Sequence, residues 1–291
     1  MLMSTEKIGY ISLVSFLLLD WLFPVFSVEV INNVGVLWLV TLSTWVAWFF
    51  SLWVLLKKKK LNQYKQKEII VPTILWWLWL WIGTLFYFYG IKYLNASLAS
   101  VLLLLQIPIW FIVFNVFGKE QYNHQQFIGS MLMFIWGFIV VYKWWNLLNI
   151  WSLIMLLATV LMVFWNFFVK KASKHWASSF FLLFNRSILM FVIIGIITYL
   201  FDGAPNISII KESFLDIIAI WFLFMFLAKV LWINALKNLN SIIPLSSFPF
   251  VSIIAIILAY FMLGETLNNQ QIIGLLPIFI GFFLLTYYKI S

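Results

Sequence analysis

The stretch Lys119-Glu120-Gln121-Tyr122-Asn123-His124-Gln125-Gln126-Phe127-Ile128-Gly129 has a counterpart near the C-terminus of the chain. The counterpart reads Gly264-Glu265-Thr266-Leu267-Asn268-Asn269-Gln270-Gln271-Ile272-Ile273-Gly274. A shift of 145 residues places Glu120 on Glu265, Asn123 on Asn268 and Gly129 on Gly274 without a gap. Continued upstream, the same shift carries Lys92, Leu94 and Asn95 onto Lys237, Leu239 and Asn240. One constant offset over this length predicts a duplication, with residues 1–145 as the first copy and 146–291 as the second.

The composition is that of a protein embedded in a lipid bilayer. Of the 291 residues, 65% are hydrophobic and 9% are charged, and the mean hydropathy is +1.06. A soluble domain would carry about 25% charged residues. Apolar runs of about 18 residues or more recur along the chain, and each is long enough to cross the hydrocarbon core as a helix. We therefore predict an all-α integral membrane protein.

Ten transmembrane helices are predicted, five in each copy. Those of the first copy are expected near Ile8–Ser27, Val34–Leu56, Ile69–Ile91, Ala96–Phe117 and Gln126–Tyr142. Those of the second are expected near Ile150–Val169, Trp176–Phe201, Phe214–Leu236, Ile242–Leu263 and Gln271–Tyr288. Because five is an odd number, the two copies are expected to lie upside down relative to each other, as inverted repeats typical of transporters.

The lysines predict the orientation. If both termini are cytoplasmic, thirteen lysines lie in inside loops and three, Lys92, Lys143 and Lys211, lie outside. The positive-inside rule favours this arrangement, in the plasma membrane. The same placement explains the net charge of +9 without a nucleic-acid partner, because the lysines other than Lys229 lie in loops between apolar runs.

Several of these motifs resemble the EamA domain of the drug/metabolite transporter superfamily. In the second copy they are Leu239-Asn240-Ser-Ile-Ile-Pro244, Pro249, Leu263-Gly264-Glu265-Thr-Leu and Gln271-Ile-Ile-Gly274. The first copy has Leu94-Asn95-Ala-Ser-Leu-Ala, Pro108, Lys119-Glu120 and Gln126-Phe-Ile-Gly129. The resemblance implies two EamA repeats, ten helices, cytoplasmic termini and alternating-access transport of small organic molecules, often outward.

The chain departs from that pattern in its first copy. Asp20-Trp21-Leu22 stands where the family often has Trp-Gly, and Gly118-Lys119-Glu120 replaces a Gly-Glu pair. The family's arginine in the second helix of each repeat is retained as Arg186, whereas the first copy has Thr41 or Thr44 nearby.

Asp20 and Lys229 are the strongest candidates for chemistry inside the membrane. Asp20 lies on the order of 18 Å into its span, at 1.5 Å per residue. A carboxylate at that depth usually faces a cavity or a partner. Asp20 is therefore a proton carrier or a clamp for a cation, or else a structural ion pair or a helix-to-helix hydrogen bond. Lys229 leans toward the membrane centre, so it is expected to face the pathway or to pair with Asp20.

Further substrate-binding candidates come from the repeat and from proline positions. The shift places Asp20-Trp21 on Trp165-Asn166, so each copy has a polar group beside tryptophan, although an asparagine alone is more often a contact between helices. The shift also pairs Tyr87 with Trp232. Gln106 precedes Pro108 in a span that the proline interrupts. Arg186 is a secondary candidate, for which snorkelling to the inner face is the favoured interpretation.

Other positions have structural interpretations or argue against other functions. Glu120 and Glu265 are expected to cap the helices that follow them. There is no cysteine and no Walker A motif, and His124 and His175 lack metal-site spacing, so neither a cofactor nor an enzymatic activity is predicted.

The sequence therefore predicts a secondary transporter that exports a small metabolite, such as an amino acid or an aromatic compound. Protons are the candidate coupling ion, and the lipid bilayer and the small-molecule substrate are the expected partners. The alternatives are uptake, flipping of a lipid-linked precursor, or a non-transporting membrane scaffold. The sequence leaves substrate, direction, coupling ion and oligomeric state open.

Overall fold

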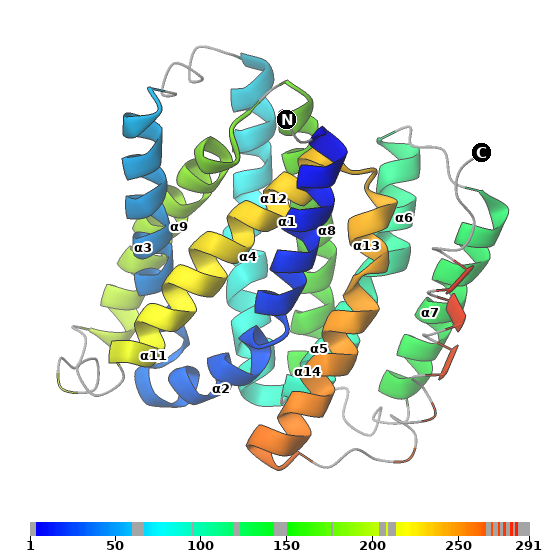
Figure 1. The fold of residues 1–291 in the computed structure, drawn as a ribbon. Helices are drawn as coiled ribbons and strands as arrows, with labels where there is room; N and C mark the ends of the chain where they lie inside the picture. Colours follow the sequence, from blue (N-terminus) through cyan, green and yellow to red (C-terminus); the bar gives the residue numbers. More distant parts are fainter. Residues whose placement is uncertain are drawn as a thin grey trace.

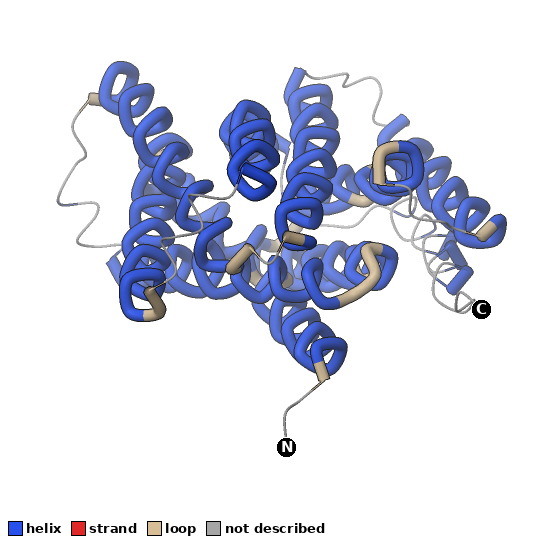
Figure 2. The backbone as a smooth tube through the Cα atoms, turned by 90° about the horizontal axis from the view of Figure 1, so that it is seen from above, coloured by secondary structure: helices blue, strands red, loops and turns tan. Residues whose placement is uncertain are grey.

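A computed structural model gives the fold as a bundle of α-helices (Figure 1). It describes residues 4–59, 67–94, 96–118, 123–142, 150–175, 177–203, 208 and 214–265, together with scattered residues from 269 to 284. The helices of the first half are α1 Thr5–Asp20, α2 Phe23–Val34, α3 Val36–Lys57, α4 Lys67–Leu94, α5 Ala96–Leu103, α6 Gln106–Val116 and α7 His124–Tyr142. Those of the second half are α8 Ile150–Lys174, α9 Ser179–Asp202, α11 Phe214–Ala219, the π-helix η3 Ile220–Leu227, α12 Ala228–Asn238, α13 Ile242–Ser246 and α14 Phe248–Leu263. Figure 2 shows the described part as helices and short turns, with no strand among the described residues.

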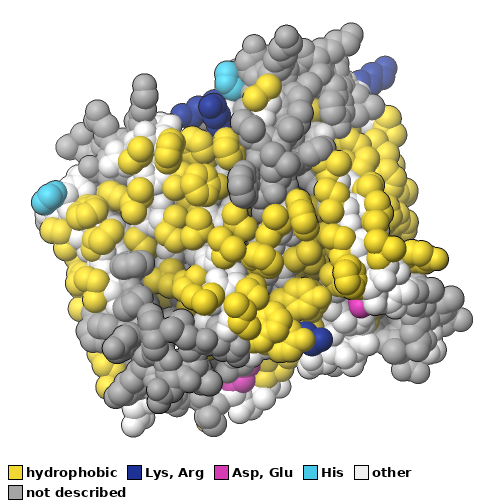
Figure 3. Space-filling model, turned by 180° about the vertical axis from the view of Figure 1, so that it is seen from behind, with side chains coloured by type: hydrophobic (Ala, Val, Ile, Leu, Met, Phe, Trp, Pro, Cys, Tyr) yellow, Lys and Arg dark blue, Asp and Glu magenta, His cyan; other side chains and the backbone are white. Residues whose placement is uncertain are grey.

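Three of the described helices are long and apolar enough to cross a membrane by themselves. They are α3, α8 and α9, and α1 with α2 forms a further span if the pair, bent by 41°, is counted as one. Large apolar side chains such as Leu200, Phe201 and Phe261 are exposed on the outside of the bundle. Figure 3 shows one face of this surface, where hydrophobic side chains form a broad band and Lys and Arg side chains gather mainly along one edge. An apolar belt of this kind is what a bilayer requires, so the chain is an all-α membrane protein.

The predicted spans agree with the described helices in position, but four of them are divided. The first, fourth, eighth and ninth predicted spans correspond to α1–α2, α5–α6, α11–η3–α12 and α13–α14. The tenth predicted span, near Gln271–Tyr288, lies mostly outside the described residues. The count of ten and the inverted arrangement therefore stay predictions.

Proline explains three of the breaks. A proline within a helix lacks the N–H that would bond to the carbonyl four residues earlier, and its ring clashes with that carbonyl. Counting back four residues from Pro24, Pro108 and Pro249 gives Asp20, Leu104 and Leu245. Asp20 is the last residue of α1, and Leu104 follows the last residue of α5 directly. Leu245 precedes the end of α13 by one residue. These three breaks are thus set by local sequence.

The centre of the bundle consists of three helix pairs. Helix α4 packs along α8, α3 along α9, and α1 along α12. Glycine permits the first of these close approaches: a Cβ atom on Gly90 would lie 2.6 Å from Met155 Sδ, and one on Gly83 would lie 3.0 Å from Leu161 Cβ. Small residues at helix contacts are the usual means of close packing in membranes.

The end of α14 connects the two halves of the chain. Gly264 ends the helix in the left-handed conformation (φ 67°), and the Glu265 N–H donates to the carbonyl of Ala259. Glu265 Oε1 then accepts a hydrogen bond of 3.1 Å from the N–H of Ala96, the first residue of α5. The expectation that Glu265 caps the helix after it stays a prediction, because residues 266–268 lie outside the described part of the chain. Glu120 lies outside the described residues.

Candidate functional site

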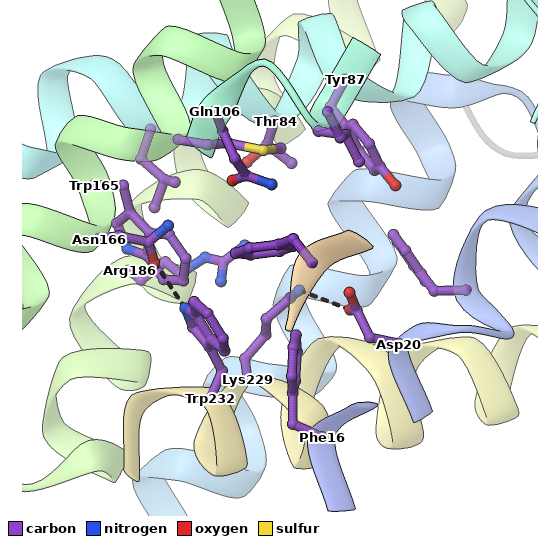
Figure 4. A pocket seen from close by; sticks show the side chains of 15 residues that line it. Phe16, Asp20, Thr84, Tyr87, Gln106, Trp165, Asn166, Arg186, Lys229 and Trp232 are labelled. Carbon is purple, nitrogen blue, oxygen red and sulfur yellow. Dashed lines mark hydrogen bonds and ion pairs between the residues drawn. The ribbon is translucent and has the colours of Figure 1, made fainter. Parts of the chain in front are cut away.

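A cavity of about 80 Å³ lies in the middle of the bundle, lined by side chains from both halves of the chain (Figure 4). Seven of the residues that carry polar groups there are Asp20, Thr84, Tyr87, Gln106, Asn166, Arg186 and Lys229. Apolar and aromatic residues complete the wall: Phe16, Phe23, Leu80, Leu103, Met162, Trp165, Trp232 and Phe248. The volume has room for a few water molecules, so the cavity is small in this conformation.

The side chains of Asp20 and Lys229 form an ion pair across the cavity. Lys229 Nζ lies 3.5 Å from Asp20 Oδ1, and the side chains are 18% and 15% exposed, respectively. The rings of Phe16 and Phe23 lie 5.7 Å and 5.8 Å from the same Nζ. Local structure places both ends of the pair, because Asp20 ends α1 at the Pro24 break and Lys229 is the second residue of α12, which follows the π-helix η3. π-Helical turns occur often at functional sites.

Arg186 projects into the same cavity from α9. Only 6% of it is exposed, and its guanidinium lies 5.0 Å from the centre of the Trp165 ring. Its Nη1 atom is buried and has no hydrogen-bond partner among the described residues. The interpretation of Arg186 as a snorkelling side chain is corrected, because the guanidinium faces the cavity and stacks on an indole instead of reaching the membrane surface.

Asn166 and Trp232 satisfy each other. The indole N–H of Trp232 donates a hydrogen bond of 2.7 Å to Asn166 Oδ1. The Trp232 ring also packs against Phe16 at 4.7 Å and Phe248 at 5.2 Å between centroids. This bond joins Trp232 of α12 to Asn166 of α8. It satisfies polar atoms that would otherwise need a ligand or water.

Helices α4 and α6 supply polar groups that have no such partner. Thr84 and Tyr87 lie one turn apart on α4, and Gln106 is the first residue of α6, after the break caused by Pro108. Gln106 is 2% exposed and Tyr87 is 6% exposed. The structure gives the hydroxyl groups and the amide no hydrogen-bond partner within the described part of the chain, and Figure 4 shows the amide of Gln106 directed into the cavity. Buried polar groups without partners are the ones available to a ligand.

The structure brings together most of the residues that the sequence singled out. Asp20, Tyr87, Gln106, Asn166, Lys229, Trp232 and the secondary candidate Arg186 all line the cavity. Trp21 does not. Successive residues of a helix point about 100° apart, so a turn that aims Asp20 at the cavity aims Trp21 elsewhere. A role of these residues in binding substrate stays a prediction.

Sequence reasoning missed Thr84 and gave Trp165 no role. Both could have been found by the repeat offset, since Thr84 matches Lys229 and Trp165 matches Asp20. Leu103 and Phe248 form another cavity pair at the same offset. Among the described residues, no group of three or more His, Asp or Glu side chains comes together, so the described part of the chain presents no metal site.

Residues 149–287 match the sequence model of a family described as EamA-like transporters. No curated protein matches the chain. Among solved structures, a crystal structure of a protein described without an activity is similar in fold, with a TM-score of 0.72 and 15% identity. The alignment covers 97% of this chain and 98% of the other. At this identity the likeness concerns the fold of nearly the whole chain, whereas the family match concerns its second half.

Proposed function

The chain belongs to the EamA-like transporter family, and we propose that it is a secondary transporter that moves a compact organic molecule outward across the plasma membrane. The observation that carries this proposal is the central cavity. Ionisable side chains inside a membrane bundle are costly and usually mark the path of a substrate or ion. Asp20, Arg186 and Lys229 meet there, whereas a membrane scaffold would not need them.

We infer further that the chain consists of two inverted five-helix repeats, 1–145 and 146–291. The cavity supports this, because several lining residues are related by the offset of 145: Asp20 with Trp165, Thr84 with Lys229, Tyr87 with Trp232 and Leu103 with Phe248. The packing of the helix pairs is also related by the offset of 145. The packing of α4 on α8 has its counterpart in α12 on α1, and α3 packs on its own counterpart α9. In repeats of this kind the substrate site lies between the halves.

The cytoplasmic face is proposed to be the one at which α1 begins. The ends of α3, α8 and α12 lie on that side in Figure 1, and they carry Lys57–Lys59, Lys170, Lys171, Lys174 and Lys237. Of the described lysines outside the spans, Lys92 is at the opposite face. This asymmetry favours cytoplasmic termini.

Transport is proposed to occur by rocking of the two halves around the cavity. The Asp20–Lys229 pair provides a coupling device, because the carboxylate and ammonium come from different halves and can separate when the halves move. A carboxyl group that meets a cation in one conformation only binds its proton with different affinity in the two conformations. Asp20 is therefore proposed as the proton carrier, with the proton moving against the substrate.

The substrate is proposed to be compact, with an apolar or aromatic part. Phe16, Trp165, Trp232 and Phe248 contribute aromatic faces to the cavity wall, and two cations, Arg186 and Lys229, line it. A large polyanion such as a nucleotide sugar would require more fixed positive charge.

Reconstitution into liposomes tests the proposed function. Purified protein should catalyse saturable accumulation of a small aromatic or amino-acid substrate driven by a proton gradient. Uncoupling the gradient should abolish accumulation and leave exchange. If the protein transported a nucleotide sugar and no small metabolite, the substrate assignment would fail. If it transported no solute at all, the transporter assignment itself would fail.

A further inference from the structure

Arg186 is a buried cation for which the described chain supplies no counter-ion. It is 6% exposed, and its Nη1 lacks a hydrogen-bond partner in the described residues. Its guanidinium lies against the Trp165 ring in a cation–π contact. A buried charge without a partner is costly, and an arginine offers five donors in a planar fork. The interaction with one indole face satisfies none of those in-plane donors.

The ionisable groups of the cavity do not balance. Asp20 contributes one negative charge, whereas Lys229 and Arg186 contribute one positive charge each, so the cavity carries a formal net charge of +1. The single carboxylate is engaged by Lys229 at 3.5 Å. A ligand with one negative charge would neutralise the cavity, whereas a neutral or cationic ligand would leave the guanidinium uncompensated in surroundings of low dielectric constant.

The neighbours of Arg186 suit a carboxylate in particular. The guanidinium fork matches the two oxygens of a carboxylate, and such a pair is stronger than a bond between neutral groups. Gln106 adds an amide directed into the cavity, and Thr84 adds a hydroxyl. Trp165 and Trp232 provide apolar faces beside these groups, and the Asn166 bond keeps Trp232 in place.

From these contacts we propose that the substrate is a compact monocarboxylate whose carboxylate binds Arg186 and Gln106 and whose apolar body lies against Trp165 and Trp232. This inference rests on the proposed transport function and names the chemical class of its substrate. The Asp20–Lys229 pair is left intact when such a ligand binds, so substrate and proton occupy different groups.

Matched pairs of acids and amides test the proposal by direct binding. The probes are isobutyrate, phenylacetate and indole-3-acetate, each with its neutral amide, measured by calorimetry on the purified full-length protein at constant chloride. At least one acid should bind the wild type at least about tenfold more tightly than its amide, the loss expected when a charged hydrogen bond is replaced by a neutral one. Arg186→Met should remove this preference, and Arg186→Lys, which keeps the charge and loses the fork, should retain part of it. If no acid binds more tightly than its amide, Arg186 is not the anion-binding group.

Further measurements distinguish a loss of acid binding from misfolding of the variant and from a failure of the transport proposal. Lys171→Met removes a cation from the exposed end of α8 and should leave the acid preference unchanged. Each variant should give wild-type size-exclusion behaviour, and an Arg186→Met protein that does not is replaced by Gln106→Leu, which should weaken acid binding severalfold. Transport of neutral or cationic solutes that Arg186→Met leaves intact would overturn the carboxylate inference while the transporter function stands. Tight acid binding without any flux in liposomes would overturn the transport function and leave the site standing.

Discussion

The two halves of the chain build the cavity from matching positions but give it different charges. Where the second half has Lys229, the first has Thr84, and where the first has Asp20, the second has Trp165. The arginine of the second half, Arg186, corresponds to Thr41, which bonds to Thr198 at 2.8 Å between α3 and α9. The scaffold is thus nearly the same in the two halves, while the acid comes from one half and both cations come from the other. A substrate between them would meet an electrostatic field that is asymmetric although the helix plan repeats.

The helix contacts show a second difference of the same kind. Gly83 and Gly90 of α4 correspond to Ala228 and Ala235 of α12, and both alanines are fully buried. Helix α4 contacts α8 through the glycines, where the ideal Cβ positions lie within about 3 Å of Met155 and Leu161. The first half therefore uses the smallest residue where the second half uses the next smallest.

The strongest effect is expected from removing the acid that only the first half carries. Asp20→Asn keeps the shape of the side chain and removes its titration, so proton-driven accumulation in proteoliposomes should be abolished while substrate exchange persists. Asp202→Asn, at the exposed end of α9, is the matched control and should transport like the wild type. Normal accumulation by Asp20→Asn with an unchanged pH dependence would make Asp20 a structural residue.

Removing the cation of the second half should reduce stability. Lys229→Met leaves Asp20 without its partner in the bundle interior, which costs about 3 kcal/mol at the lower end of the range for broken buried pairs. The effect is measured as a lower unfolding midpoint in detergent. The double variant Asp20→Asn, Lys229→Met should regain much of the loss, because the interior then holds no carboxylate that has lost its cation. A double variant as unstable as the single one would show that Lys229 contributes through packing.

Enlarging a glycine of α4 tests the difference in helix contacts. Gly90→Ala places a Cβ 2.6 Å from Met155 Sδ, which can rotate away, and 3.3 Å from Met155 Cβ, which is fixed to α8. We therefore expect a small shift of α4 against α8, with a loss of about 1–2 kcal/mol. Gly195→Ala in α9 is the matched control, because its Cβ would lie 3.6 Å from Thr41 Cγ2 and the helix would gain about 0.5–1 kcal/mol. Opposite shifts of the unfolding midpoint are expected. Equal shifts would mean that Gly90 does not set the approach of the helices.

The smallest effect is expected at the connection between the halves. Glu265→Ala removes the acceptor for the Ala96 N–H at the start of α5 and should cost about 1 kcal/mol, as for other lost N-terminal caps. Glu265→Gln retains an acceptor oxygen and should lose less. Backbone amide hydrogens in the first turn of α5 should exchange faster in Glu265→Ala than in the wild type, and the remaining amides should not change. Identical exchange in the two proteins would contradict the capping role of Glu265.

Composition and internal repetition were sufficient to predict the class of fold, and sequence reasoning named seven of the fifteen residues that line the cavity. Apolar runs required membrane helices, and the offset paired Tyr87 with Trp232, which both line the cavity. The direction of individual side chains was harder to predict. Trp21 lies outside the cavity although its neighbour Asp20 lines it. Arg186 lies against the Trp165 ring, a contact between residues of two different helices that depth along one helix does not predict.

The breaks in the helices were predictable only in part. Pro108 was recognised as an interruption, but Pro24 was not connected with the break directly after Asp20. The partner of Glu265 could not be inferred, because the contact joins residues 169 positions apart. Such contacts are set by the tertiary arrangement of the halves, about which local sequence carries little information.

The central claim, that the cavity opens alternately to both faces of the membrane, is tested most directly by a single cysteine at Thr84. The chain contains no cysteine, so Thr84→Cys gives one reactive site in the cavity. A membrane-impermeant thiol reagent should label it from outside in intact cells and from the cytoplasmic side in inside-out vesicles. Ile196→Cys, exposed on the apolar surface, should react from neither side. Labelling of Thr84→Cys from one side only, under all gradients applied, would contradict alternating access through this cavity.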